Sequence, residues 1–321
     1  MEIIHTHTGK IYVDKDRRLE FLTVGDYGKE NNIKADFLGL TKEINGVANT
    51  KVDLSDKWVA TISTQKGCPM KCQFCDCPKY GFHGNASIDD MCYEIEQILK
   101  GETVKYTKRF NVHFARMGEP TFNAGVLSFA ENYLRPLVEE YIKADTIHPV
   151  ISTMLPNSNI HLRDFISEWC RIKNHVYNGE AGLQFSINST NDAQRTVQFG
   201  GNSLRLADIS ELSDKLPAPN GRKYTLNFAV TAQTILDARE LSRLFDKDKF
   251  IVKITPIHET HEANENGINT PEGYYKYDVY RQFEQPLLEE GWEVIVFIPS
   301  KEEDEDRITC GNALLSLERE E

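Results

Sequence analysis

The chain has 321 residues, of which 40% are hydrophobic and 27% are charged. It therefore has enough apolar material for a buried core, and this excludes a disordered or low-complexity protein. No apolar run approaches the roughly 20 residues that a membrane span needs, and the first residues lack the basic and apolar regions of an export signal. We expect a cytoplasmic protein without a membrane segment.

The formal net charge is −12, which disfavours binding to phosphate backbones unless the surface carries a local basic patch. One candidate for such a patch is the stretch with Lys100, Lys105, Lys108 and Arg109. Such a stretch is more often an ordinary solvated segment than a nucleic-acid interface.

The first 55 residues contain short apolar runs separated by glycines, at Ile11–Val13, Leu19–Val24 and Phe37–Leu40. They predict a small β-rich extension over residues 1–55.

After residue 55 the chain alternates between strands and helices. The expected strands are Trp58–Ser63, Arg109–Phe114, His148–Ser152, Gly182–Asn188, Tyr224–Val230 and Phe250–Thr255. The expected helices between them are Ile88–Lys100, Gly125–Lys143, Leu162–Ile172, Ser203–Lys215 and Ile235–Phe245.

Six such βα repeats predict a parallel sheet with right-handed crossovers. A helix at Pro271–Glu289 and a strand at Trp292–Ile298 should follow, and the chain then becomes acidic from Lys301 onward. We therefore divide the chain into an extension at 1–55, a barrel domain at 56–300 and a C-terminal tail at 301–321.

Seven cysteines are an odd number for a disulfide framework, and their distribution is uneven. Cys68, Cys72 and Cys75 form a C-x3-C-x2-C loop directly after the first strand of the repeat, and Cys77 follows. Three thiolates on one loop can ligate three irons of a cubane [4Fe-4S] cluster and leave the fourth iron open. A zinc knuckle or unligated thiols are the alternatives.

With Phe74 before its third cysteine, this loop resembles that of the radical S-adenosylmethionine (SAM) superfamily. The resemblance implies an α/β fold, a partial (β/α)6 barrel similar to a TIM barrel. It also implies that the open iron of the cluster binds SAM. The active site of such a barrel lies at the carboxyl ends of its strands.

Polar residues occur after three successive strands. Gly118 and Glu119 follow the second strand, Ser152 ends the third, and Ser186 and Asn188 end the fourth. A glycine permits close backbone approach and a carboxylate can pair with an ammonium group. Turn chemistry alone explains any one of them, but their shared register favours a binding site for SAM.

Longer strings are similar to the RlmN/Cfr family, which methylates an adenine carbon of RNA. They are Ser63-Thr-Gln-Lys-Gly-Cys68, Met117-Gly-Glu-Pro and the tail Cys310-Gly-Asn-Ala-Leu. The resemblance implies that Cys310 accepts a methyl group from one SAM molecule, and that a deoxyadenosyl radical from a second then activates it. It further implies a reducing partner such as flavodoxin or ferredoxin, an RNA substrate, and a cofactor contact at His258, where the family has asparagine.

Three features depart from this family. Thr61 stands where the family has a second cysteine that resolves the product, and Ala48 stands where it has a proton-accepting glutamate. Cys77 is a candidate to replace the missing thiol. The family's helical N-terminal RNA-binding extension is absent, which together with the acidic charge disfavours ribosomal RNA as the substrate.

Two other functions remain open. A radical SAM enzyme of another reaction class would use the deoxyadenosyl radical directly on a nucleotide, a small molecule or a peptide, with Cys310 as a hydrogen donor or bystander. A non-catalytic protein would keep the cluster for structure or sensing, but such a cluster needs neither Glu119 nor Ser152.

Overall fold

The computed structural model describes residues 1–24, 53–270 and 272–315, together with the backbone of 41–44 and 47–50. No helix in this part of the chain is long and apolar enough to cross a membrane.

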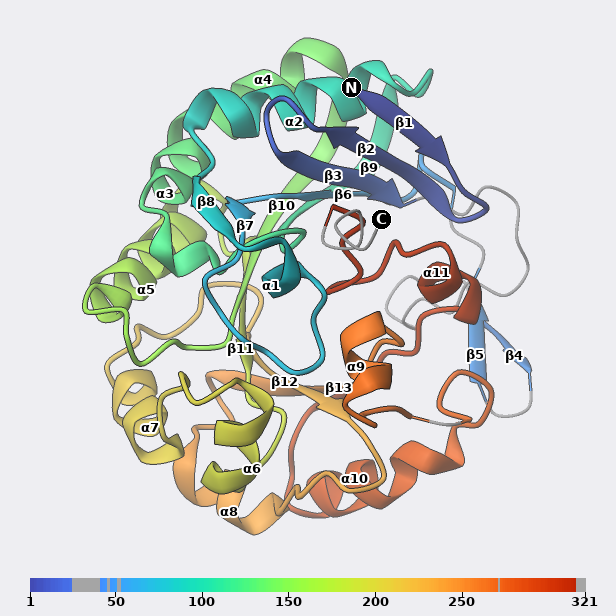
Figure 1. The fold of residues 1–321 in the computed structure, drawn as a ribbon. Helices are drawn as coiled ribbons and strands as arrows, with labels where there is room; N and C mark the ends of the chain where they lie inside the picture. Colours follow the sequence, from blue (N-terminus) through green and yellow to red (C-terminus); the bar gives the residue numbers. More distant parts are fainter. Residues whose placement is uncertain (25–40, 45–46, 51–52, 271, 316–321) are drawn as a thin grey trace.

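The described residues form a ten-stranded sheet that curls into a partial barrel (Figure 1). Its parallel strands lie in chain order, each paired with the next. They are β6 (Trp58–Ile62), β9 (Tyr106–Phe114), β10 (Lys143–Thr153), β11 (Gly182–Ser186), β12 (Tyr224–Val230), β13 (Phe250–Pro256) and β14 (Val294–Val296). The predicted fold is thus confirmed, with β14 adding a seventh parallel strand to the six of the repeat.

The N-terminal strands extend this same sheet. β1 (Glu2–His5), β2 (Gly9–Asp14) and β3 (Leu19–Val24) form an antiparallel meander, and β3 pairs antiparallel with β6. The hairpin β4 (Thr41–Ile44) and β5 (Val47–Thr50) follows. The strand expected at Phe37–Leu40 lies outside the described residues, as does the side chain of Ala48. The domain boundaries at 55 and 300 stay predictions.

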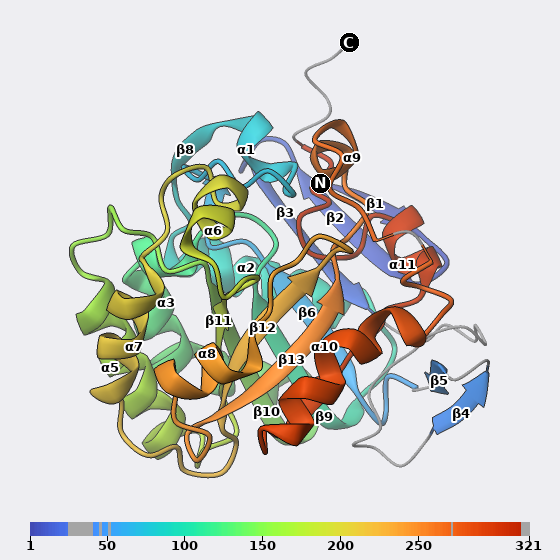
Figure 2. The ribbon, with the colours of Figure 1, turned by 90° about the horizontal axis from the view of Figure 1, so that it is seen from below.

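Helices cover the outer face of the barrel (Figure 2). They are α2 (Ile88–Lys100), α3 (Gly125–Ser128), α4 (Leu134–Tyr141), α5 (Leu162–Arg171), α7 (Leu206–Asp214), α8 (Ala238–Leu244) and α10 (Asp278–Glu289). The helix predicted at Ile88–Lys100 has these same bounds. It begins with a capping box, in which the Ser87 side chain and the Asp90 carboxylate each accept a hydrogen bond from the other's backbone amide.

The helices predicted from Ser203 and Ile235 begin three residues later, at Leu206 and Ala238. Two other predicted helices differ more from the structure. The helix predicted at Gly125–Lys143 contains a π turn, Phe129–Tyr133, just before Pro136, whose ring nitrogen cannot donate the next helical hydrogen bond. The helix predicted from Pro271 begins only at Asp278, because Glu272 has a φ of 64° and a right-handed helix cannot include that conformation.

Shorter elements connect the carboxyl ends of the strands. They are β7 (Gln65–Gly67), β8 (Phe82–Asn85), α1 (Cys77–Tyr80), the 3-10 turn η2 (Pro120–Phe122), α6 (Asp192–Gln198), α9 (His261–Glu265) and α11 (Lys301–Glu305). The π turn η4 (Ile172–Val176) instead continues α5 towards the amino end of β11. The acidic stretch that follows Ser300 therefore contains a helix, α11, capped by the Ser300 side chain.

The two faces of the barrel wall differ in polarity. Outward side chains such as Phe110, Phe185 and Phe228 join the main hydrophobic core beneath the helices. Alternate residues, including His113 and Lys253, line cavities inside the barrel. This alternation follows from the period of two in a β-strand, and it leaves the barrel interior polar.

Candidate functional site

A cavity of about 200 Å³ opens at the carboxyl ends of the parallel strands. Most of the predicted site residues line it, namely Cys75, Ser152, Ser186, Asn188, His258 and Cys310. They come from three strand ends, the cysteine loop and the C-terminal segment. The structure therefore brings together residues separated by as many as 235 positions, although their roles stay predictions.

The cysteine loop runs from β7 to α1 beside this cavity. Burial raises the pKa of Cys72 and Cys75, and the neighbouring thiols of Cys68 and Cys310 raise both pKa values further. The three predicted ligands thus lie close to one another and to Cys310, and all are free thiols. Thiols of this kind are the donors that iron–sulfur clusters take, one to each ligated iron.

Single metal ions call for a different arrangement of donors. Among the described residues, no three His, Cys, Asp or Glu side chains are placed to hold one ion.

Cys77, the candidate resolving thiol, begins α1 and is buried. A hydrogen bond with Cys68 raises its pKa, with burial as the second cause, and the backbone of Gly118 acts in the opposite direction. The groups that shift the pKa of Cys77 are therefore Cys68, Cys75 and the backbone of Gly118. Cys77 is not among the residues that line the cavity beside Cys310.

Gly118 and Glu119 lie at the end of β9, beside the loop. Gly118 has a φ of 102°, and a Cβ at this position would lie 2.6 Å from the Gln65 side chain, so the turn requires glycine. The Gln65 Oε1 atom in turn accepts a hydrogen bond of 2.9 Å from the Glu119 amide. This contact fixes the backbone of Glu119, and so the point from which its side chain extends.

The Glu119 carboxylate is buried and hydrogen-bonded only to neutral donors. Oε1 accepts from the amide and hydroxyl of Thr121, at 3.2 and 2.7 Å, and Oε2 accepts from the Met154 amide at 3.0 Å. Burial raises its pKa, and these hydrogen bonds act against that rise. No salt bridge joins Glu119 to a cation within the described residues. A buried carboxylate without a cation suits the ammonium group of an amino acid.

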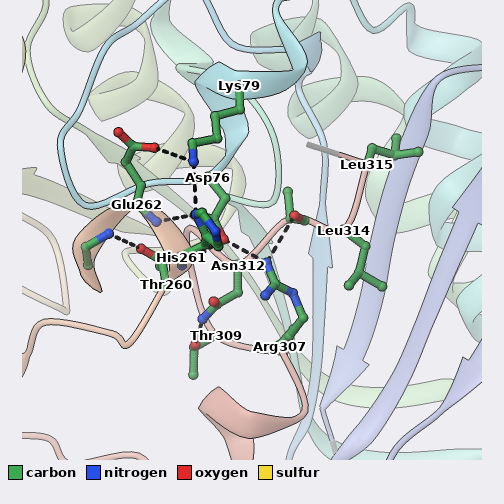
Figure 3. A network of polar contacts seen from close by, with 12 residues as sticks. Asp76, Lys79, Thr260, His261, Glu262, Arg307, Thr309, Asn312, Leu314 and Leu315 are labelled. Atoms are coloured by element: carbon green, nitrogen blue, oxygen red, sulfur yellow. Dashed lines mark hydrogen bonds and ion pairs between the residues drawn. The ribbon is translucent and has the colours of Figure 1, made fainter. Parts of the chain in front are cut away.

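The C-terminal segment, residues 306–315, places Cys310 beside the cysteine loop. The Asp76 amide donates to the Gly311 carbonyl at 2.9 Å. The buried Asp76 carboxylate accepts from Arg307 at 2.7 Å and from the Glu262 amide at 2.8 Å (Figure 3). Asp76 therefore joins the cysteine loop, α9 and the C-terminal segment.

A second contact holds this segment from the other side. Arg116 is buried at the end of β9 and pairs with the equally buried Glu20 of β3. Arg116 also donates to the carbonyls of Thr309 and Asn312, while Glu20 accepts from the amides of Leu314 and Leu315. One buried ion pair thus binds both backbone donors and acceptors of the segment.

The Cys310 side chain is exposed, but its exposed surface faces the cavity. Its Sγ atom lies 3.6 Å from the Ala115 carbonyl oxygen. The surrounding protein raises the pKa of the thiol, whereas the cations of Arg116 and Lys253 favour the thiolate. Two nearby cations favour the thiolate form, in which a thiol acts as a nucleophile.

His258 has an acidic partner. Its Nδ1 atom lies 3.0 Å from Oδ1 of the buried Asp304, which also accepts hydrogen bonds from Tyr274 and Thr309. Burial alone would raise the pKa of Asp304, but His258 and these hydroxyl donors lower it to about 2. The ionised Asp304 thereby orients the imidazole at the cavity wall.

Lys253 and His113 both line the cavity but are not among the predicted site residues. In β13 the alternation of Lys253 with apolar residues signals only that its side chain faces away from the hydrophobic core, and β9 carries several other polar residues, so His113 has no distinct signal. Glu20 and Arg116 are not among the predicted residues either, since nothing local pairs residues in different parts of the chain.

No protein-family model matches the chain. Its sequence relatives include the probable dual-specificity RNA methyltransferase RlmN of Thermotoga sp. (strain RQ2), 36% identical over 235 residues, which are 70% of this chain and 62% of the relative. The dual-specificity RNA methyltransferase RlmN of Campylobacter fetus is 31% identical over 121 residues, 38% of this chain and 33% of the relative. The chain thus spans less than two thirds of the length of these relatives.

A solved structure has the same fold. The radical SAM methyltransferase from Sphaerobacter thermophilus aligns with a TM-score of 0.65 and 18% identity, over 98% of this chain and 80% of that one. The chain is thus similar in sequence to proteins named as RlmN-type RNA methyltransferases, and it shares its fold with the solved structure from Sphaerobacter thermophilus.

Proposed function

We propose that the chain is a radical SAM methyltransferase in which Cys310 carries the methyl group. The observation that carries this proposal is the hydrogen bond of 2.9 Å between the Asp76 amide and the Gly311 carbonyl, which holds Cys310 against the cysteine loop. A thiol kept beside a cofactor cavity by a buried carboxylate is suited to accept a group from that cofactor.

Cys68, Cys72 and Cys75 would hold a [4Fe-4S] cluster, and Glu119 with Ser152 would bind the amino-acid end of SAM. When bound, these cofactors supply a transferable methyl group and, after one-electron reduction, a carbon-centred radical. Ser186, Asn188 and His258 line the remaining wall. The Asn188 Oδ1 atom accepts from the Ala229 amide at 3.1 Å, so its side chain is already oriented.

Cys310 would attack the methyl group as a thiolate, so that a carbon–sulfur bond forms at Sγ while the sulfonium bond breaks. The demethylated thioether of SAM would leave, and the thiol proton of the exposed Cys310 would pass to solvent before the attack. Arg116 and Lys253 would stabilise the thiolate that remains. Cys77 does not line this cavity, so the proposal leaves the resolving step without an assigned thiol.

The relatives are named as RNA methyltransferases, which supports an RNA adenine as the acceptor. The reductant would be a flavodoxin- or ferredoxin-type protein, since the cluster needs single electrons. A cytoplasmic location is part of the same proposal, because the cysteine loop needs reduced thiols.

Cys310→Ala tests the methyl-carrier role. Under anaerobic reconstitution with SAM and a reductant, we expect the variant to cleave SAM reductively but to transfer no methyl to total RNA. Mass spectrometry of the parent should show a methyl group on Cys310. Cys92→Ala, a half-buried cysteine on α2, is the matched control and should behave like the parent.

Methyl transfer by Cys310→Ala at the parent rate would contradict the proposal. It would instead favour direct use of the radical on the substrate, with Cys310 as a bystander.

A further inference from the structure

A second cavity, of about 160 Å³, lies at the amino ends of the parallel strands. It shares His113, Gln184, Lys253 and Phe297 with the wall of the first cavity. The strand register explains the overlap, since Ser186, Asn227 and Lys253 lie side by side on three neighbouring strands. The two cavities therefore meet along the axis of the barrel.

This lower cavity is strongly basic. The cationic residues of its wall are Lys57, Arg109, Arg222, Lys223 and Lys253, and no aspartate or glutamate is among the described residues that line it. The chain as a whole has a net charge of −12. Positive charge is thus concentrated inside the barrel of an acidic protein.

Two of these cations, Arg222 and Lys253, make few polar contacts through their side chains with the described residues. Lys223 lies 3.4 Å from Glu293, and Arg109 donates to Asn111 Oδ1 at 3.1 Å. Arg222 reaches only the Glu180 carbonyl, at 3.5 Å, and the Lys253 ammonium lies 5.0 Å from the centre of the Phe297 ring. Lys253 and Arg222 therefore keep hydrogen-bond donors for a ligand.

The pKa values of residues that line the lower cavity reflect this crowding of positive charges. Burial, together with the neighbouring cations Lys253, Lys57, Arg222 and Arg109, lowers the pKa of His113 to about 3. Burial, with a further contribution from Arg222, lowers the pKa of Lys253 to about 8. An anion in the cavity would relieve this repulsion.

We propose that the lower cavity is an anion site, in which Lys253 and Arg222 bind a phosphoryl group. A guanidinium and an ammonium group are the donors that proteins use for phosphate oxygens. The Asn111 amide nitrogen and the Gln184 side chain supply neutral donors at the same wall. The phosphoryl group can belong to free phosphate or to a nucleotide. The site goes beyond the proposed methyl transfer and does not depend on it.

Isothermal titration of the full chain, with its cluster reconstituted, tests the site with inorganic phosphate at constant ionic strength. We expect saturable binding of one phosphate, weakened at least tenfold in both Lys253→Met and Arg222→Gln. Lys215→Met removes a charge from an exposed lysine that pairs with Glu211, so it should bind phosphate like the parent.

Two further titrations, with adenosine monophosphate and with adenosine, distinguish the sources of the phosphoryl group. Tighter binding of the monophosphate than of phosphate or adenosine assigns the site to a nucleotide, and binding of phosphate alone assigns it to the free anion. Thermal melting verifies that each variant is folded. No saturable binding by the parent, or equal binding by folded variants, overturns the proposal, and neither result affects the role of Cys310.

Discussion

Glu119 is a carboxylate buried among neutral hydrogen-bond donors. Thr121 and Met154 fix its two oxygens in place, yet none of these donors carries a positive charge. Burying an ionised carboxylate without a counterion is costly, so the site favours a ligand that brings a cation. The amino group of SAM is such a cation.

Glu119→Gln keeps the size and most hydrogen bonds of the side chain but removes its charge. We expect SAM to bind at least tenfold more weakly, because losing one partner of a buried charge pair costs about 2–5 kcal/mol. Titration calorimetry of the cluster-loaded chain measures this. Glu96→Gln, on the surface of α2 beside Lys100, serves as the control, and unchanged affinity in Glu119→Gln would refute the assignment.

At the scale of elements, the N-terminal meander and the C-terminal segment depend on each other. Glu20 of β3 holds the amides of Leu314 and Leu315 and neutralises Arg116, which binds the carbonyls of Thr309 and Asn312. The extension therefore has a role in the site, because it helps to place Cys310.

Glu20→Gln leaves Arg116 buried without a counterion, a change that typically costs about 3–5 kcal/mol. We expect the C-terminal segment to detach more readily. Iodoacetamide should then label Cys310 faster than in the parent, and proteases should cut within residues 306–315. Glu2→Gln, at an exposed position of β1, should leave both rates unchanged. Equal labelling rates in Glu20→Gln and the parent would rule out this dependence.

The sequence predicts the elements whose signal is local. The helix Ile88–Lys100 has its capping box and its apolar face within its own residues, and the strand Phe250–Thr255 is a short apolar run. The cysteine loop and Cys310 were likewise predicted, because their spacing is contained in short strings.

Other features depend on how the sheet closes. Lys253 belongs to an apparently apolar strand, and only barrel closure shows that its side chain faces an internal cavity. The ion pair between Glu20 and Arg116 joins residues 96 positions apart, and no local pattern signals it. The late start of α10 follows from the backbone of Glu272, a conformation that residue type alone does not predict.

At the scale of the whole molecule, charge is separated between inside and outside. The net charge of −12 is spread over the chain, whereas the lower cavity gathers Arg222, Lys253 and three further cations. Such an arrangement attracts small anions into the barrel. The crowded cations also make the folded barrel less stable than its packing allows.

Lys253→Met should therefore raise the melting temperature at neutral pH. The pKa of Lys253 falls from 10.5 to about 8 on folding, so the folded state disfavours the protonated amine. That destabilisation, roughly 3 kcal/mol at most, is complete below pH 8 and disappears as the pH rises towards 10.5. Melting curves across this range should show the advantage of the variant shrinking with pH. An advantage independent of pH would mean that packing, and not charge, is its cause.

The contacts that hold the C-terminal segment beside the site also determine the order in which parts of the chain fold. Asp306 and Thr8 are 298 positions apart, and Glu20 and Leu315 are 295 apart, so these are among the widest loops that the chain closes. Loops of this length close late, and local unfolding opens such contacts before it opens the strands of a core. The cysteine loop would thus remain open to incoming iron and sulfide until the C-terminal segment docks. Assembly of the cluster and completion of the methyl-accepting site then become successive steps in the maturation of one chain.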